Sequence, residues 1–222
     1  MASRSFAGLG SCTSEYTASL AGEGADLAAA GTVLDWGSGP GRMTAHLLHQ
    51  APQAKVTAVD TDAGAIAWLA ENLAVARAHA IPVKPPTHFS PDAFDVVIGH
   101  SVFSHLDVEA QDAWLGELAR VTRPGGSLAV SVNGATALTW HREHPLVDVP
   151  ASVEEQARAD GVAVWTEDGW DELFYPGYHT TFHTPDYIRD HWSRWFDVLS
   201  IHDGAATPGQ DIVVLRAREG GT

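Results

Sequence analysis

The hydrophobic pattern of the chain alternates between short apolar runs, rich in β-branched residues, and longer stretches with helical spacing. The first apolar run is 32–35, and residues 42–50 follow it with an apolar stripe along one helical face. Further runs typical of strands lie at 55–60, 81–83, 94–100, 127–132, 196–201 and 212–217, and helical patterns at 63–78 and 110–121. Repeated β–α units of this kind predict an α/β fold with a largely parallel sheet.

Three of these runs carry topological information. The run 94–100 is almost continuously apolar, which is typical of a strand buried on both faces, so we place it at the centre of the sheet. The last two runs are joined by 204–209, a connection too short for a crossover helix. We therefore expect the last two strands to pair in antiparallel orientation.

Between 134 and 194 the periodicity weakens, and aromatic and histidine residues gather, most densely at 165–183. Thr184 and the proline after it predict a helix start, because they fit an N-cap followed by proline at the first helical position. We interpret 134–194 as an inserted substrate lid and 1–31 as an N-terminal cap segment. The whole chain, 1–222, is expected to form a single domain.

Composition narrows the choice of partners. The 222 residues suit one α/β domain, and 45% apolar residues are enough for a continuous core. With 28 acidic and 13 basic side chains, the formal net charge is −15, which repels nucleic-acid phosphates and anionic membrane surfaces. We therefore expect neither a nucleic acid nor a membrane as partner.

The cysteine content and the hydropathy favour a cytoplasmic location. Cys12 is the only cysteine, so the chain can form neither an internal disulfide nor a thiolate metal cluster. The first ten residues lack the apolar core of a signal peptide, and no stretch reaches the roughly 18 apolar residues of a membrane span. The sequence does not predict an oligomeric state.

A glycine-rich loop follows the first strand. The strand ends near an acidic residue, Asp35, and Gly37, Gly39 and Gly41 come next, before a helix. Glycines allow a tight turn and leave the backbone bare, so a ligand can lie against it. Asp60 closes the second strand at the same edge of the sheet, where its carboxylate can accept hydrogen bonds from two ribose hydroxyls. The pattern predicts a nucleoside site.

The spacing of this loop argues against NAD. The dinucleotide fingerprint is G-x-G-x-x-G, whereas this loop reads G-x-G-x-G, and Asp35 would meet a pyrophosphate unfavourably. S-adenosylmethionine carries no phosphate, and its ammonium group suits an acidic neighbour, either directly or through water. The residues therefore favour S-adenosylmethionine as cofactor.

The stretch Val-Leu-Asp-Trp-Gly-Ser-Gly-Pro-Gly-Arg at 33–42 resembles the first motif of the class I S-adenosylmethionine-dependent methyltransferases. Three further stretches resemble the family's ribose motif, its fourth-strand motif and its turn into strand five, and they lie at 58–62, 94–97 with 103–106, and 118–126. The resemblance implies a doubly wound, Rossmann-like seven-stranded sheet in the order 3-2-1-4-5-7-6, with strand seven antiparallel. This agrees with the pairing expected for the last two strands.

The resemblance also implies which residues bind the cofactor. The glycine loop would hold the methionine portion, the second-strand acid the ribose, and the residues after strand four would lie near the sulfonium. The implied set is Asp35, Gly37, Ser38, Gly39, Gly41, Asp60, Thr61, His100 and Ser101. Many family members have an acid after strand three for the adenine, but none lies between Asn72 and Pro91 here. We expect backbone groups near Thr87 and His88, with an apolar side chain, to take its place.

Three histidines are candidates for a general base, which a hydroxyl or protonated amine acceptor would need: His100, His105 and His141. His105 follows strand four, where it could act on the substrate or merely cap or pack. His141 and His144 are spaced to hold a metal or to lie in a solvated loop, but a catalytic metal site normally has three protein ligands, so we expect no metal. Trp36 fits either stacking on a substrate or packing in the core.

The resulting prediction is S-adenosylmethionine-dependent methyl transfer to a small molecule, and the aromatic lid favours an aromatic or sugar-like acceptor. Two alternatives remain at this point. One is an enzyme of the same fold that binds the cofactor but catalyses another reaction, such as a cyclisation, and the other is a non-catalytic cofactor-binding protein. Transfer of a labelled methyl group to an acceptor would separate the first reading from both.

Overall fold

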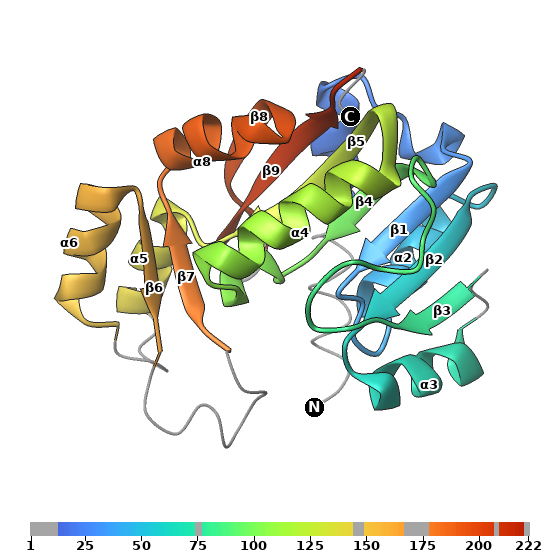
Figure 1. Ribbon diagram of the computed structural model, residues 1–222, viewed down its shortest axis with the longest axis horizontal. Coiled ribbons are helices and arrows are strands. Elements are labelled where there is room, and N and C mark those ends of the chain that lie inside the picture. The colour runs from blue at the N-terminus through green and yellow to red at the C-terminus, as the bar shows by residue number, and fades with distance from the viewer. Residues whose placement is uncertain (1–12, 74–76, 144–148, 167–177, 207–208, 220–222) are drawn as a thin grey trace.

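The computed structural model describes residues 13–73, 77–143, 149–166, 178–206 and 209–219, which form two sheets with helices packed against them (Figure 1). The larger sheet has seven strands in the order β3-β2-β1-β4-β5-β9-β8. These strands are β1 (Thr32–Trp36), β2 (Lys55–Asp60), β3 (Arg77–Ala80), β4 (Phe94–Gly99), β5 (Thr122–Val132), β8 (Phe196–Ala206) and β9 (Gln210–Ala217). β9 runs antiparallel to both of its neighbours, β5 and β8. The predicted strand order and the antiparallel last strand are thus confirmed.

Helices and 3-10 turns connect the strands and cover the sheet on both faces. They are η1 (Leu27–Ala29), α2 (Arg42–Gln50), α3 (Ala63–Asn72), η2 (Phe103–His105), α4 (Val108–Val121), α5 (Ala135–Glu143), α6 (Ala151–Asp160), α8 (Pro185–His191) and η3 (Trp192–Arg194), and residues 13–22 are also helical. No helix within the described ranges combines the length and the apolar character needed to cross a membrane.

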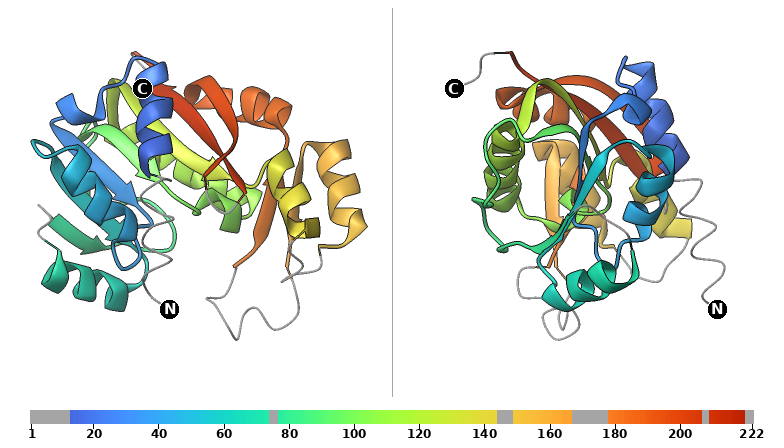
Figure 2. Two further views of the ribbon diagram at one scale, coloured as in Figure 1. Left: turned by 180° about the vertical axis from the view of Figure 1, so that it is seen from behind. Right: turned by 90° about the vertical axis from the view of Figure 1, so that its right-hand side faces the viewer.

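Alternate residues of the central strands supply two separate cores. Leu34 of β1 and Leu128 of β5 face α4 and the segment around Trp192. Val33 and Ala129, their neighbours in sequence, face the opposite side, where the helix 13–22 and α2 pack. Figure 2 shows these two layers, with α4 on one side of the sheet and the N-terminal helix on the other. Successive strand residues point to opposite faces, so continuous apolar runs are buried on both sides.

Side-chain caps fix several helix starts. Asp62 accepts hydrogen bonds from the amides of Gly64 and Ala65 at the start of α3. Thr184 accepts one from the amide of Tyr187, and proline follows it at the first turn of α8. The helix start predicted at Thr184 is therefore confirmed.

The third strand lies earlier in the chain than predicted. We expected a helix from Ala63 to about residue 78 and a strand at 81–83, but α3 ends at Asn72 and β3 is Arg77–Ala80. The alanine-rich composition favours helix locally, whereas pairing with β2, from Thr57 opposite Arg77 onward, stabilises an edge strand. β3 is partly exposed and lacks an apolar run, so hydrophobic pattern alone points to its neighbour instead.

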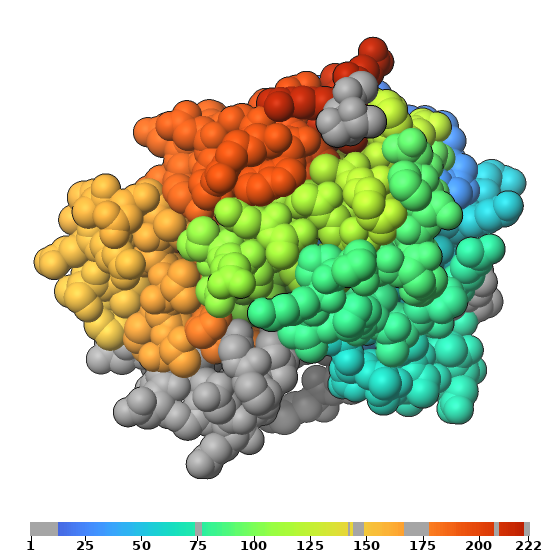
Figure 3. Space-filling model, in the orientation of Figure 1, coloured from blue at the N-terminus to red at the C-terminus, as the bar shows by residue number. Residues whose placement is uncertain are grey.

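The region 134–194 builds a separate two-stranded sheet beside the large one. β6 (Val162–Trp165) and β7 (Thr180–His183) pair antiparallel there. A third core cluster, Ala137, Val153, Ala157, Ala163 and Phe182, packs α5 and α6 against this small sheet. In the space-filling view, its yellow and orange atoms meet those of α4 directly (Figure 3). The assignment of this region as a substrate lid remains a prediction, and residues 144–148 and 167–177 lie outside the described part.

Candidate functional site

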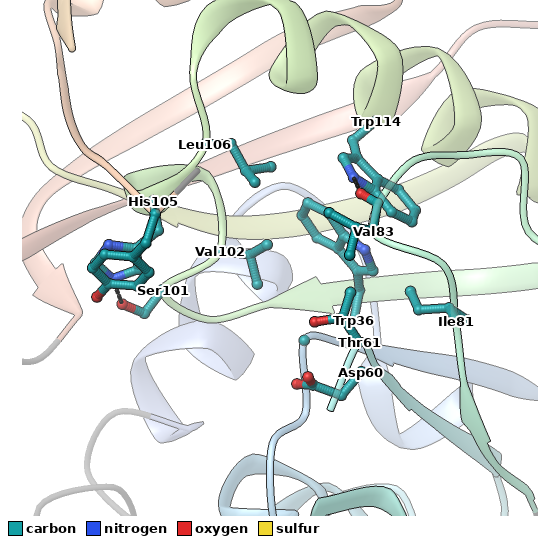
Figure 4. Close-up of a pocket in the computed structure, with 12 residues that line it drawn as sticks. Trp36, Asp60, Thr61, Ile81, Val83, Ser101, Val102, His105, Leu106 and Trp114 are labelled. Atoms are coloured by element: carbon teal, nitrogen blue, oxygen red, sulfur yellow. Dashed lines mark hydrogen bonds between the residues drawn. The ribbon is translucent and has the colours of Figure 1, made fainter. Parts of the chain in front are cut away.

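A cavity of about 190 Å³ opens at the carboxyl ends of β1, β2 and β4 (Figure 4). It is lined by Trp36, Gly37, Asp60, Thr61, Ile81, Val83, Ser101, Val102, His105, Leu106, Trp114 and Tyr178. Open α/β sheets bind ligands at this edge. Five predicted site residues line the cavity: Gly37, Asp60, Thr61, Ser101 and His105.

The glycine loop is held by the end of β2. The amides of Gly37 and Ser38 donate to the carbonyl oxygen of Val59 at 2.9 and 3.0 Å, and the amide of Gly39 donates to the Asp60 carboxylate at 2.7 Å. These amides are therefore used within the protein, and what the loop offers a ligand is the bare backbone expected from its glycines. Gly37 has φ 75°, and a Cβ there would collide with the Val102 side chain. Glycine at this position keeps the cavity open.

Gly41 has a different task from Gly37. It begins α2 with φ 86°, and a Cβ on it would lie 2.6 Å from Cδ1 of Leu73 and 2.7 Å from Cδ1 of Leu69. The missing side chain lets α2 start close to α3. Its predicted contact with the cofactor stays a prediction, and the packing alone accounts for glycine here.

The Asp60 carboxylate has free acceptor sites beside the cavity. Its Oδ2 accepts from the Gly39 amide and its Oδ1 from the Asp62 amide at 2.9 Å. A carboxylate has about four acceptor positions, so two amide bonds leave room for two hydroxyl donors. This arrangement suits a ribose with neighbouring hydroxyls, as the sequence predicted for Asp60.

Asp35 lies behind the loop, 1% exposed. Its Oδ2 accepts a hydrogen bond from the Thr44 hydroxyl at 2.5 Å. Burial, opposed by the Thr44 hydrogen bond and reinforced by the charge of Asp60, raises the pKa of Asp35 to about 7. A carboxyl group of this kind holds its proton or meets a cation, which is compatible with the ammonium contact predicted for it.

His100 faces the N-terminal helix. Its Nδ1 lies 3.1 Å from the hydroxyl of Tyr16, which is fully buried. Burial and then the nearby charge of Arg42 lower the pKa of His100 to about 4, so its ring is neutral at physiological pH. The residues lining the cavity do not include His100, and its predicted roles near the sulfonium and as a base stay predictions.

His105 is the predicted base that borders the cavity. Its Nδ1 lies 3.0 Å from the carbonyl oxygen of His179, which can only accept, so Nδ1 carries the proton. Burial lowers the pKa of His105 from its ordinary range, and the neutral ring therefore has its lone pair on Nε2. The Tyr178 hydroxyl lies 3.1 Å and the Ser101 hydroxyl 3.3 Å from this nitrogen. The ring also stacks on Tyr178, with centroids 4.3 Å apart.

His141 lies away from this cavity, on α5. Its ring meets Phe182 edge-on, with centroids 5.8 Å apart, and its Nδ1 is buried without a partner among the described residues. Burial lowers the pKa of His141. Its role as a base stays a prediction, and His144 falls outside the described residues. No three metal-binding side chains gather anywhere in the described part of the chain.

The apolar wall opposite the glycine loop comes from the segment after β3. Ile81 and Val83 line it, and the Trp114 indole nitrogen donates to the Val83 carbonyl at 3.2 Å. The amide and hydroxyl of Thr87, which we expected near the adenine, both donate to the Glu117 carboxylate, at 2.7 and 2.5 Å. The backbone donor expected at Thr87 is therefore already engaged.

Trp36 packs in the core, and its stacking on a substrate stays a prediction. It is 2% exposed and packs on Phe103 and Trp114, with ring centroids 5.0 and 5.2 Å away, and it also lines the cavity. Sequence reasoning did not single out Val102 as a lining residue, although it lies between the two parts of the fourth-strand motif, which is a usable signal. Tyr178 belongs to the aromatic-rich stretch 165–183, but the composition of that stretch does not show which of its aromatic residues reaches the cavity.

Comparison with known proteins supports the family that the sequence motifs imply. Residues 33–126 match a family model described as a methyltransferase domain. These residues contain the glycine loop, Asp60, Ser101 and His105, in the arrangement described above. The match and the fold are consistent with the class I methyltransferase family. The cofactor of this family is S-adenosylmethionine.

Solved structures similar to this chain share its fold at low sequence identity. The 1,6-didemethyltoxoflavin-N1-methyltransferase of Burkholderia thailandensis, solved with 1,6-didemethyltoxoflavin and S-adenosylhomocysteine, is 19% identical with a TM-score of 0.64, covering 94% of this chain and 79% of that one. A putative methyltransferase from Listeria monocytogenes is 15% identical with a TM-score of 0.62, covering 93% and 99%. Human N-acetylserotonin methyltransferase, solved with S-adenosylmethionine, is 15% identical with a TM-score of 0.57, covering 87% and 49%. A search of curated proteins finds no match.

Proposed function

We propose that the protein transfers the methyl group of S-adenosylmethionine to a small-molecule acceptor, with His105 as the general base. The observation that carries the proposal is one cavity that joins the glycine loop and Asp60 to the unprotonated Nε2 of His105. The solved neighbours that bind the same cofactor or its demethylated product support this choice.

The chain's own residues fit the cofactor in three ways. The backbone at Gly37 leaves space that a Cβ would fill, and Asp60 keeps acceptor sites for two ribose hydroxyls. Ile81, Val83 and Val102 offer apolar walls for an adenine ring. Aromatic faces and aliphatic side chains bind a flat heterocycle without an acid after β3. When bound, the cofactor supplies a methyl group on a positively charged sulfur, which is open to in-line attack.

His105 would take the proton that the acceptor must lose. Its Nε2 would accept the proton of the acceptor's O–H or N–H while that atom attacks the methyl carbon and S-adenosylhomocysteine is the leaving group. The ring would afterwards return this proton to water. A neutral ring at pH 7 is ready for this task, since its pKa lies below the ordinary range. Activity should therefore be constant near pH 7 and fall as acid protonates His105.

The remaining groups would exclude water and align the acceptor. Tyr178 covers one face of the His105 ring, and Trp36 and Leu106 line the adjoining wall. Alignment of reacting groups is worth roughly 7–11 kcal/mol in such displacements. An acceptor with an aromatic ring fits walls of this kind, which supports a small aromatic molecule over a charged polymer.

Calorimetry with S-adenosylhomocysteine tests the cofactor site directly. We expect Asp60→Ala to weaken binding by at least about tenfold, because two hydrogen bonds to a carboxylate are lost. Asp92→Ala, which removes an exposed carboxylate from the opposite end of the sheet, is the control and should bind as the parent does. Equal affinity of Asp60→Ala and parent, or binding of NADH by the parent in place of S-adenosylhomocysteine, would contradict the assignment.

Incubation with S-adenosylmethionine labelled at the methyl group, together with a metabolite extract, tests the reaction. We expect label to move into a small extractable product and not into protein, nucleic acid or lipid. Cofactor that binds but yields no labelled product would refute methyl transfer.

A further inference from the structure

Buried polar groups connect the first residue of β9 to the cavity. Gln210 is 5% exposed, and its Nε2 donates to Ser101 Oγ at 3.1 Å and to Asn133 Oδ1 at 3.2 Å. Its Oε1 accepts from the Ser131 hydroxyl at 2.8 Å. Ser101 in turn lies 3.3 Å from His105 Nε2. The chain of contacts thus runs from the last strand of the sheet to the proposed base.

Two backbone groups fix the direction of these hydrogen bonds. The Ser101 amide can only donate, and it donates to Ser131 Oγ at 2.7 Å, so the Ser131 hydroxyl proton is left for Gln210 Oε1. The Thr181 carbonyl can only accept, and it accepts from Asn133 Nδ2 at 3.2 Å, so Asn133 Oδ1 accepts from Gln210. Both routes give the same orientation of the Gln210 amide.

The same reasoning fixes the direction of the hydrogen bonds at His105, the other end of this chain of contacts. The His179 carbonyl keeps a proton on Nδ1 of His105, so Nε2 accepts in the neutral ring. Because Ser101 Oγ already accepts from Gln210, its own proton can point to that nitrogen. Once Nε2 is protonated, the hydroxyl can turn its proton toward Ser104 Oγ, 3.3 Å away, and accept from His105 instead.

The backbone at Ser101 indicates that this geometry is imposed. Ser101 has φ 58°, in the left-handed region that residues with a side chain seldom adopt. Such conformations persist where the surroundings hold them from several sides. Here the amide is held by Ser131 and the hydroxyl by Gln210.

We propose that Gln210 is a positioning residue that orients the Ser101 hydroxyl as the hydrogen-bond partner of His105 in both of its protonation states. The proposal rests on the proposed function of His105 as the base. The other titratable or charged groups around His105 in the described chain are the Tyr178 hydroxyl, 3.1 Å from Nε2, and the pair of His179 and Asp107, 3.9 Å apart. The variants below leave these groups unchanged.

The test is an NMR titration of the His105 ring in four proteins without substrate: parent, Ser101→Ala, Gln210→Met and the double variant. Ser101→Ala should lower the pKa of His105 by about half a unit to one unit, because a hydrogen bond to the charged ring is stronger than one to the neutral ring. Gln210→Met should cause part of this fall in the parent and none in the Ser101→Ala background. The acid limb of kcat against pH should move in the same direction, with the KM for S-adenosylmethionine unchanged by Gln210→Met.

Thr122→Val is the matched control, because it removes a buried hydrogen bond, 2.7 Å to the Leu118 carbonyl, from the other end of β5. It should leave the pKa of His105 and kcat unchanged. If Gln210→Met does not fold, Gln210→Asn keeps the amide but shortens its reach and serves the same comparison.

An equal shift from the Gln210 substitution in both backgrounds, or no shift in either, would overturn the proposal. The titration needs no turnover, so its failure is separate from that of the proposed function. That function fails instead if His105→Gln keeps full methyl transfer.

Discussion

At the loop end of the cavity, the lining residues Gly37, Asp60 and Thr61 come from the first two β–α units, whereas His105 at the other end is held by segments far apart in the chain. The loop end is closed by bonds between near neighbours, such as the Gly39 amide on Asp60. The histidine end depends on the His179 carbonyl, 74 residues away. The loop end is thus encoded in one continuous stretch, while the histidine end is assembled from distant parts of the fold.

The strongest test of this difference is His105→Gln. We expect kcat to fall by about 10²–10⁴-fold, the usual contribution of a general base, while the affinity for S-adenosylhomocysteine stays within about twofold of the parent. Steady-state kinetics on an identified acceptor and calorimetry measure the two quantities. His49→Gln is the control, since that histidine is exposed at the end of α2, lies outside the cavity and should leave kcat unchanged. A large fall in cofactor affinity for His105→Gln would show that the two ends do not act separately.

A substitution of Asp35 tests whether the buried carboxyl group at the loop end of the cavity lowers the free energy of unfolding. Folding raises the pKa of Asp35 from 3.8 to about 7, so the folded protein keeps a proton that the unfolded chain has lost between these values. Stability therefore falls as the pH rises through this window, and it is lowest above pH 7. We expect Asp35→Asn, which can still accept from Thr44, to raise the free energy of unfolding by about 2 kcal/mol near pH 8 and by little near pH 4.

Urea unfolding at the two pH values measures this difference. If Asp35 also meets the ammonium group of the cofactor, saturating S-adenosylhomocysteine should stabilise the parent more than Asp35→Asn at pH 8. An advantage of Asp35→Asn that is the same at both pH values would show that the carboxyl proton is not involved.

The smallest expected effect comes from Gly37→Ala. The new Cβ would push the Val102 side chain into the cavity, and we expect the affinity for S-adenosylhomocysteine to fall by about tenfold. Gly125→Ala is the matched control for a left-handed glycine, since Gly125 has φ 73° with open space around it. It should cost a similar amount of stability without changing affinity. Unchanged affinity in Gly37→Ala would mean that the ligand does not approach this backbone.

The parts of the fold that the sequence predicts are those in which local pattern and tertiary pairing agree. α2 and β2 have the predicted bounds, and the antiparallel pairing of β8 with β9 follows from the short connection between them. β3 was misplaced because an edge strand needs only one hydrogen-bonded neighbour and little apolar character, so its sequence leaves no clear signal.

The residues of the candidate site show the same difference between those that local sequence encodes and those that depend on the tertiary fold. Gly37 and Asp60 could be identified because their chemistry is encoded by spacing within one motif. Tyr178 could be identified only as one of the aromatic residues of the stretch 165–183, and Gln210 not at all, since each reaches the site only through the folding of a segment that is distant in sequence. No periodicity or composition marks a glutamine at the start of a strand as the partner of a serine more than a hundred residues earlier.

The place of β9 between β5 and β8 has a consequence for biosynthesis. During translation, the strands that surround the glycine loop leave the ribosome well before Gln210 does, and they can pair with one another while the later strands are still being made. The nascent chain would therefore acquire its nucleoside-binding half first. Only the arrival of the last strand would add Gln210 to the hydrogen bonds that hold Ser101 beside His105.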